Sequence, residues 1–144
     1  KSPYLELVAA AWRLNENIPG FLLNKIKNEL GSLEGKKVAL LGLAFKKNID
    51  DLRYSLSIKM QNYLLTEGAQ VFAHDPLIQS QPLDVCLKSA DVVIVAVNHD
   101  AYSKIKLNSI RKLVSKDCLI CDIWNIFGTG KIVFYPKTVQ KLLK

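Results

Sequence analysis

The first 30 residues carry apolar side chains at the spacing of an amphipathic helix. They are Leu5, Val8, Ala9 and Trp12, followed by Leu22, Leu23, Ile26 and Leu30. Ser2 and Pro3 suit the N-cap and the first position of a helix. Pro19 falls inside the same segment, where it removes an intrahelical hydrogen bond and clashes with the preceding turn. We therefore expect a long N-terminal helix, kinked or split within residues 15–20.

Beyond Gly35 the pattern changes to short apolar runs that alternate with amphipathic segments, which is typical of βαβ units. The predicted strands cover residues 38–41, 70–74, 92–97 and 118–122. The predicted helices cover residues 57–65, 82–89 and 107–113, and a last one begins at Thr138. The run at 92–97 is continuously apolar, as expected for a central parallel strand covered on both faces.

These elements predict an α/β fold in two regions. Residues 1–31 form the kinked helical region, and residues 36–144 form a three-layer, Rossmann-like domain around a parallel sheet. In such sheets ligands bind beyond the carboxyl ends of the strands. Polar residues follow all four predicted strands, at 42–46, 75–76, 98–100 and 122–125.

The segment after the first strand is the best candidate for a ligand site. The strand ends at Gly42, and the basic residues Lys46, Lys47 and Arg53 follow within the next eleven positions. The three-glycine dinucleotide fingerprint is absent, so side chains rather than backbone N–H groups must make more of the contacts with a phosphate. The pattern predicts a nucleotide site.

Composition narrows the class of protein. A chain of 144 residues with 49% hydrophobic content fits one globular domain with its own core. No apolar run approaches the roughly 20 residues that cross a bilayer, and no secretion signal is visible, so we expect a cytosolic (cytoplasmic) domain without membrane contact. The net charge is +7, but the lysines are dispersed, which favours a solvated surface over a nucleic-acid face. The chain does not begin with methionine, and its first residues already resemble the start of a helix. We therefore expect a fragment of a longer protein.

Cysteine and aspartate motifs suggest metals, but simpler interpretations are favoured. Cys118 and Cys121 have metal-site spacing, yet residues i and i+3 of a strand point to opposite faces. We expect buried side chains, because a second CxxC and a clustered histidine are missing, and reduced thiols, because three cysteines are an odd count in a chain without a secretion signal. Asp50 and Asp51 could hold magnesium, although helix capping or pairing with Arg53 and the lysines is favoured. We expect no metal site.

Two His-Asp dipeptides, His74-Asp75 and His99-Asp100, could suggest acid/base pairs. Adjacent residues of a strand face opposite ways, so roles in lining the crevice or in capping are favoured. No Ser/His/Asp arrangement, Walker loop or pair of catalytic carboxylates is visible. The chain therefore suits binding of a phosphorylated ligand better than catalysis, and we name no catalytic residue.

The two tryptophans have different predicted places. Trp12 lies on the apolar face of the N-terminal helix, which indicates either a core position or a dimer interface. Trp124 follows the last predicted strand and falls in the ligand crevice. There its ring can stack on a base or can simply pack, and both alternatives stay open.

One long motif resembles a known family. The run from Leu41 to Ser55, LGLAFKKNIDDLRYS, is similar to the signature of the C-terminal domain of the UDP-glucose/GDP-mannose dehydrogenase family. Further matches follow in order along the chain: Leu14–Pro19, Glu67–Val71 leading to Asp75-Pro76, Ala90–Ile94 leading to His99 and Tyr102, and a strand ending at Asp122. The resemblance covers nearly the whole chain. Residues 49–53 lean toward the branch acting on UDP-N-acetylhexosamines rather than on UDP-glucose.

The resemblance implies a function for the full-length protein. Such enzymes oxidise the C6 hydroxyl of a nucleotide sugar to a carboxylate in two hydride transfers to NAD, with the intermediate held on a cysteine. That cysteine and the NAD-binding domain lie N-terminal to the matched region, and none of the three cysteines here matches it. We therefore expect this chain to bind a uridine nucleotide weakly and to catalyse nothing. Sugar acids of this kind resemble precursors of surface polysaccharide biosynthesis.

The resemblance also assigns roles to residues. Phe45 and Lys46 match positions that contact the substrate nucleotide, and Arg53 matches an arginine that reaches the NAD pyrophosphate. The family commonly places an arginine where this chain has Ile123-Trp124-Asn125, so Trp124 is the candidate replacement. A homodimer through the first helix is expected. The alternative is a stand-alone nucleotide- or RNA-binding module that uses the basic surface.

Overall fold

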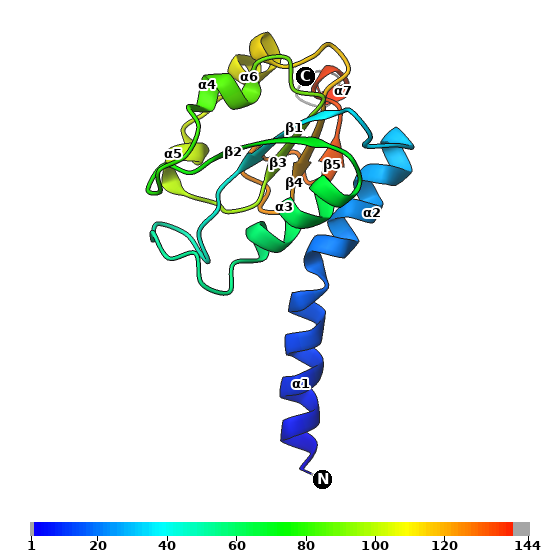
Figure 1. The fold of residues 1–144 in the computed structure, drawn as a ribbon, viewed down its shortest axis with the longest axis vertical. Helices are drawn as coiled ribbons and strands as arrows, with labels where there is room; N and C mark the ends of the chain where they lie inside the picture. Colours follow the sequence, from blue (N-terminus) through cyan, green and yellow to red (C-terminus); the bar gives the residue numbers. More distant parts are fainter. Residues whose placement is uncertain (1, 140–144) are drawn as a thin grey trace.

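The computed structural model describes residues 2–139, and Figure 1 shows a sheet with helices on both of its faces. The helices are α1 (Pro3–Glu16), α2 (Ile18–Leu30), α3 (Leu56–Thr66), α4 (Leu83–Leu87), α5 (Asp100–Ser103), α6 (Leu107–Leu113) and α7 (Pro136–Val139). The strands are β1 (Lys37–Leu41), β2 (Gln70–His74), β3 (Val92–Val95), β4 (Leu119–Asp122) and β5 (Val133–Phe134).

The sheet has the strand order β2-β1-β3-β4-β5. The first four strands are parallel, as predicted, whereas β5 pairs antiparallel with β4. The sequence did not indicate β5, because two residues are too few to show a period. The last helix begins at Pro136, two residues before the predicted start, and the predicted domain end at residues 140–144 lies outside the described residues.

Side chains of alternate strand residues supply two separate cores, one on each face of the sheet. Val38 and Leu40 pack with α2 and α3, whereas Ala39 and Leu41 pack on the side of α4 to α7. Cys121 belongs to the first core and Cys118 to the second, as expected from their spacing. The predicted three-layer, Rossmann-like fold is confirmed.

The N-terminal helical region is split where proline predicted a break. α1 ends at Glu16 and α2 begins at Ile18, with Asn17 between them and Pro19 in the first turn of α2. α1 projects away from the domain (Figure 1), and it has no buried residue. Trp12 is 63% exposed, so the core interpretation of this residue was wrong. The dimer interpretation stays a prediction.

The strand order creates a crevice at one edge of the sheet. β1 and β3 are neighbours, but β1 leads to α3 on one face and β3 leads to α5 on the other. The two connections diverge at the carboxyl ends of these strands, which is the topological switch point where open α/β sheets bind ligands. β3 ends at Val95, two residues before its predicted end, so residues 96–98 belong to this edge.

Candidate nucleotide-binding site

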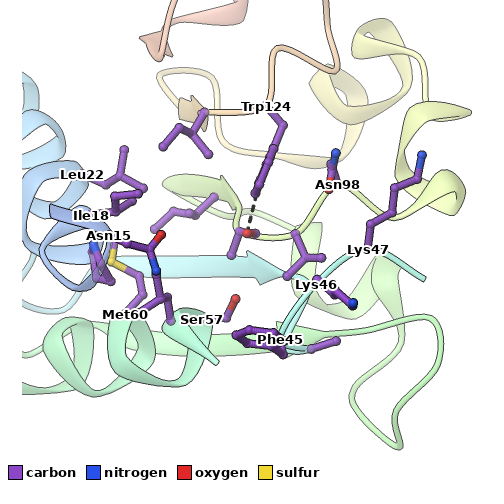
Figure 2. Close-up of a pocket in the computed structure, with 17 residues that line it drawn as sticks. Asn15, Ile18, Leu22, Phe45, Lys46, Lys47, Ser57, Met60, Asn98 and Trp124 are labelled. Atoms are coloured by element: carbon purple, nitrogen blue, oxygen red, sulfur yellow. Dashed lines mark hydrogen bonds between the residues drawn. The ribbon is translucent and has the colours of Figure 1, made fainter. Parts of the chain in front are cut away.

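A cavity of about 480 Å³ lies at the switch point, between the carboxyl ends of β1 and β3 and the helices α2 and α3. Figure 2 shows the side chains that line it. They are Asn15, Ile18, Pro19, Leu22, Ala44, Phe45, Lys46, Lys47, Leu56, Ser57, Met60, Ile94, Ala96, Val97, Asn98, Ile123 and Trp124. Most of these side chains are apolar and a few are polar, as is usual for a small-molecule site.

The structure brings together three of the four predicted site residues. Phe45, Lys46 and Trp124 line the cavity, with Trp124 at one side and Phe45 at the opposite side (Figure 2). The indole N–H of Trp124 donates to the carbonyl of Ala96 at 3.1 Å, which fixes the orientation of the ring. Trp124 is 48% exposed and Phe45 is 53% exposed, so both rings have a face available for stacking.

The loop after β1 is shaped by Gly42. Its φ is +93°, and a Cβ at this position would lie 2.5 Å from the Cβ of Val97 and 2.8 Å from the Val97 nitrogen. Glycine is needed here because the loop passes directly against the chain that follows β3. This packing explains the single glycine without any dinucleotide fingerprint.

The far end of the loop is fixed by Ser55. Its hydroxyl donates to the carbonyl of Leu43 at 2.7 Å and accepts the backbone N–H of Ser57 at 3.1 Å. Ser55 is thus the N-cap of α3, and the interpretation of Asp50 and Asp51 as capping residues was wrong.

Arg53 does not line the cavity. Its guanidinium forms a two-nitrogen contact with the carboxylate of Asp51, with Nε at 3.0 Å and Nη2 at 2.7 Å. The side-chain and backbone hydrogen bonds from Arg53 lower the pKa of Asp51 to about 2. Asp51 therefore pairs with Arg53, one of the roles favoured from the sequence. The Arg53 side chain remains 83% exposed and accessible to an anion.

A buried pair that sequence reasoning missed lies behind the loop. Nε2 of His99 lies 3.2 Å from Oδ2 of Asp75, so the pair joins one residue from each of the two His-Asp dipeptides. The same Asp75 oxygen accepts the backbone N–H groups of Leu43 and Ala44 at 2.7 and 3.0 Å. The sequence held one indication of this pair, namely that Asp75 follows β2 and His99 follows β3, the two strands that flank β1.

Two further ionisable side chains are buried, one in β4 and one directly before it. Burial raises the pKa of Cys118 and that of Cys121 to about 12, so both thiols stay protonated and unreactive. Within residues 2–139 no cluster of three or more His, Cys, Asp or Glu side chains could hold a metal ion. None of the helices in that range is both long enough and apolar enough to span a membrane.

A doubly wound sheet with an apolar, aromatic-flanked and lysine-bordered cavity at its switch point defines a nucleotide-binding domain of the Rossmann type. Residues 39–129 match the model of the UDP-glucose/GDP-mannose dehydrogenase family, UDP binding domain. The chain belongs to this family.

Individual relatives agree with this family. The chain is 32% identical over 135 residues to a UDP-N-acetyl-D-mannosamine dehydrogenase of Methanocaldococcus jannaschii, covering 89% of this chain and 31% of that protein. It is 40% identical over 75 residues to a UDP-glucose 6-dehydrogenase of Bacillus subtilis, covering 52% of this chain and 17% of that protein. The chain thus spans less than a third of the length of these relatives.

The fold is shared with a solved structure over the whole chain. A UDP-N-acetyl-mannosamine dehydrogenase of Staphylococcus aureus aligns with a TM-score of 0.75 at 21% identity, covering 100% of this chain and 37% of that one. At this level of identity the likeness concerns the fold alone.

Proposed function

We propose that this chain binds the UDP portion of a UDP-sugar, as the substrate-binding part of an NAD-dependent UDP-sugar 6-dehydrogenase. The observation that carries the proposal is the cavity at the switch point, in which Phe45, Lys46 and Trp124 come together within the segment matched to the UDP binding domain. A UDP-N-acetylhexosamine is the favoured substrate, because the M. jannaschii relative is named for such a sugar. UDP-glucose is the alternative, after the B. subtilis relative.

The side chains suggest a division of roles within the cavity. Trp124 and Phe45 offer flat apolar faces to the uracil ring. The ammonium of Lys47 is paired with Asp100 at 2.6 Å, whereas Lys46 makes no ion pair with any residue of the described range. Lys46 is therefore the cation that meets the diphosphate. Asn98 and Ser57 add polar atoms at the same edge.

The proposal assigns the oxidation itself to the remainder of the protein. When bound, NAD would accept hydride from the sugar. Arg53, exposed and outside the cavity, would hold the pyrophosphate of NAD, since a guanidinium offers paired donors to phosphate oxygens. No residue of this chain is assigned to the chemical step, so the chain alone binds substrate without turnover. The cytoplasmic location remains part of the same proposal.

Substitution of Lys46 by alanine is expected to weaken UDP binding about tenfold, because one charge-assisted contact with phosphate is lost. Isothermal titration calorimetry of the chain with UDP measures this effect. Lys116→Ala is the matched control, since that exposed lysine precedes β4 at the opposite edge of the sheet. Equal affinity of Lys46→Ala and the unmodified chain would contradict the assignment. Salt-dependent binding of RNA without UDP binding would instead favour the RNA-binding alternative.

We also propose that α1 forms a homodimer with a second copy of the chain. Leu5, Val8 and Trp12 recur at spacings of three and four residues and are all largely exposed. A free helix with this many exposed apolar side chains gains stability by covering them. In this proposal residues 1–31 supply the dimer contacts and residues 36–144 supply the nucleotide site.

The double substitution Leu5→Glu with Val8→Glu is expected to convert the dimer to a monomer, because it places charge on the covered stripe. Analytical ultracentrifugation over a range of protein concentrations measures the change. Arg13→Glu is the control, since it changes the net charge by the same amount on another side of α1. A dimer that persists in the double variant would exclude this stripe as the interface.

A further inference from the structure

The loop between β1 and α3 is tied at its start to a buried carboxylate. Asp75, 2% exposed, accepts the backbone N–H groups of Leu43 and Ala44 through Oδ2. Its Oδ1 accepts the backbone N–H of Leu77 at 2.9 Å. Burial opposes ionisation of this carboxyl most strongly, but the three backbone donors and the interaction with His99 together outweigh it and lower the pKa of Asp75. Asp75 is therefore an acceptor at both oxygens.

The acceptor character of Asp75 determines the tautomer of His99. Nε2 of His99 faces Oδ2 of Asp75 at 3.2 Å, so Nε2 carries the proton. Nδ1 faces the backbone N–H of Asn48 at 3.0 Å, so Nδ1 must accept. The buried imidazole thus satisfies both partners in one neutral tautomer.

Asn48 ties the loop a second time, a few residues further on. Its side-chain amide donates to Oδ2 of Asp100 at 2.6 Å, and its Oδ1 accepts the backbone N–H of Asp100 at 3.1 Å. Its φ of 58° lies in the left-handed region, which asparagine tolerates better than most residues. We call Asn48, His99 and Asp100 the Asn48 clasp.

The clasp and Asp75 bracket the part of the loop that lines the cavity. Phe45, Lys46 and Lys47 lie between Ala44, which Asp75 holds, and Asn48, which His99 holds. One buried Asp75–His99 pair therefore fixes both ends of the three-residue segment. The positions of Phe45 and Lys46 depend on a bond to an imidazole nitrogen that cannot accept once it is protonated.

We propose that neutral His99 is a positioning residue that holds the Phe45–Lys47 segment against the cavity, and that its protonation releases Asn48 and weakens nucleotide binding. The second part rests on the proposed function. His99 faces Asp75, which follows β2, and Asn48 of the loop. Asn48 is bonded to Asp100 of α5, whose carboxylate also pairs with Lys47. The ring of Tyr102, also in α5, lies 5.7 Å from the His99 ring between centroids. Tyr102 donates its hydroxyl to the His74 carbonyl.

The carboxylates near His99 keep their charge over the range in which an imidazole titrates. Hydrogen bonds from Lys47 and Asn48 lower the pKa of Asp100, as the backbone donors do for Asp75. Neither carboxylate changes its charge between about pH 8 and about pH 5.5, so neither is the source of a change in the loop over this range. The chain has only one other histidine, His74, whose Nδ1 contacts the Gln81 carbonyl at 2.8 Å and not Asn48.

The clasp is tested first without ligand, by NMR hydrogen exchange of the Asn48 amide in the 144-residue chain at about pH 8 and about pH 5.5. After correction for intrinsic exchange, protection is expected to fall about tenfold at the lower pH. His74→Gln is expected to keep this dependence. His99→Gln is expected to remove it, because glutamine offers one acceptor and one donor and does not ionise. Protection that is independent of pH in the unmodified chain would overturn the clasp, and this result needs no variant to fold.

Binding is tested next by calorimetry with UDP-glucose, whose esterified diphosphate keeps its charge over the same range. The dissociation constant is expected to rise about fivefold from about pH 8 to about pH 5.5 in the unmodified chain and in His74→Gln, and to stay constant in His99→Gln. Binding without any pH dependence would overturn the positioning role. Absence of binding at both pH values, with pH-dependent protection of Asn48, would overturn the proposed function and leave the clasp standing.

Discussion

Replacement of Gly42 by alanine is expected to lower the free energy of unfolding by about 3–5 kcal/mol, enough to unfold a domain of ordinary stability partly or fully. The added Cβ would meet the Cβ of Val97 at 2.5 Å and the Val97 backbone nitrogen at 2.8 Å. Rotation of the Val97 side chain does not move its Cβ, so both the Cβ and the nitrogen of Val97 can give way only if the backbone that follows β3 shifts. The φ of +93° adds strain for any residue with a Cβ.

Urea denaturation followed by circular dichroism measures this loss. Gly31→Ala is the matched control, because Gly31 has a φ of +79° but no heavy atom within 4 Å of the place that an added Cβ would take. It is expected to lose only about 1–2 kcal/mol, from the backbone strain alone. If both variants lost the same free energy of unfolding, the close approach of Gly42 to Val97 would not contribute to the loss in Gly42→Ala.

Asp75→Asn is expected to lower the free energy of unfolding by about 2–4 kcal/mol at about pH 7. The amide keeps one oxygen but turns an NH₂ group toward a backbone N–H, so at least one buried donor loses its acceptor. The oxygen that remains is neutral, so any hydrogen bonds it keeps with Leu43, Ala44 and His99 are weaker than those of the carboxylate. UDP binding is expected to weaken as well, because Phe45 and Lys46 follow directly.

The same carboxylate gives the protein a specific acid sensitivity. The folded-state pKa of Asp75 is lowered, so its contribution is fully present above its unfolded value of about 4 and is lost as the pH falls through the folded value. Denaturation at about pH 7 and about pH 3 is expected to show a smaller decline in Asp75→Asn than in the unmodified chain. Asp84→Asn is the control, since this side chain is exposed in α4. An equal decline in both variants would show that other carboxyls cause the acid sensitivity.

The sequence alone determined the layers and most of the elements, but not the short β5 and α5. The predicted segments at 70–74 and 107–113 agree with β2 and α6 residue for residue, because period and length are local properties that the chain expresses wherever it folds. The opposite faces of Cys118 and Cys121 followed from the pleat of a strand. The segment from Leu41 to Ser55 was likewise recognisable, and it lies at the predicted edge of the sheet.

Tertiary structure alone decided which residues meet. The strand order places β2 and β3 on either side of β1, and this order brings Asp75 to His99 and Gly42 to Val97, although both pairs are far apart in sequence. No local pattern records such an order, because it depends on which strand finds which neighbour. The exposure of Trp12 and the position of Arg53 outside the cavity were likewise decided by which elements pack against each other. A period tells which face of an element is apolar, and only packing tells what covers that face.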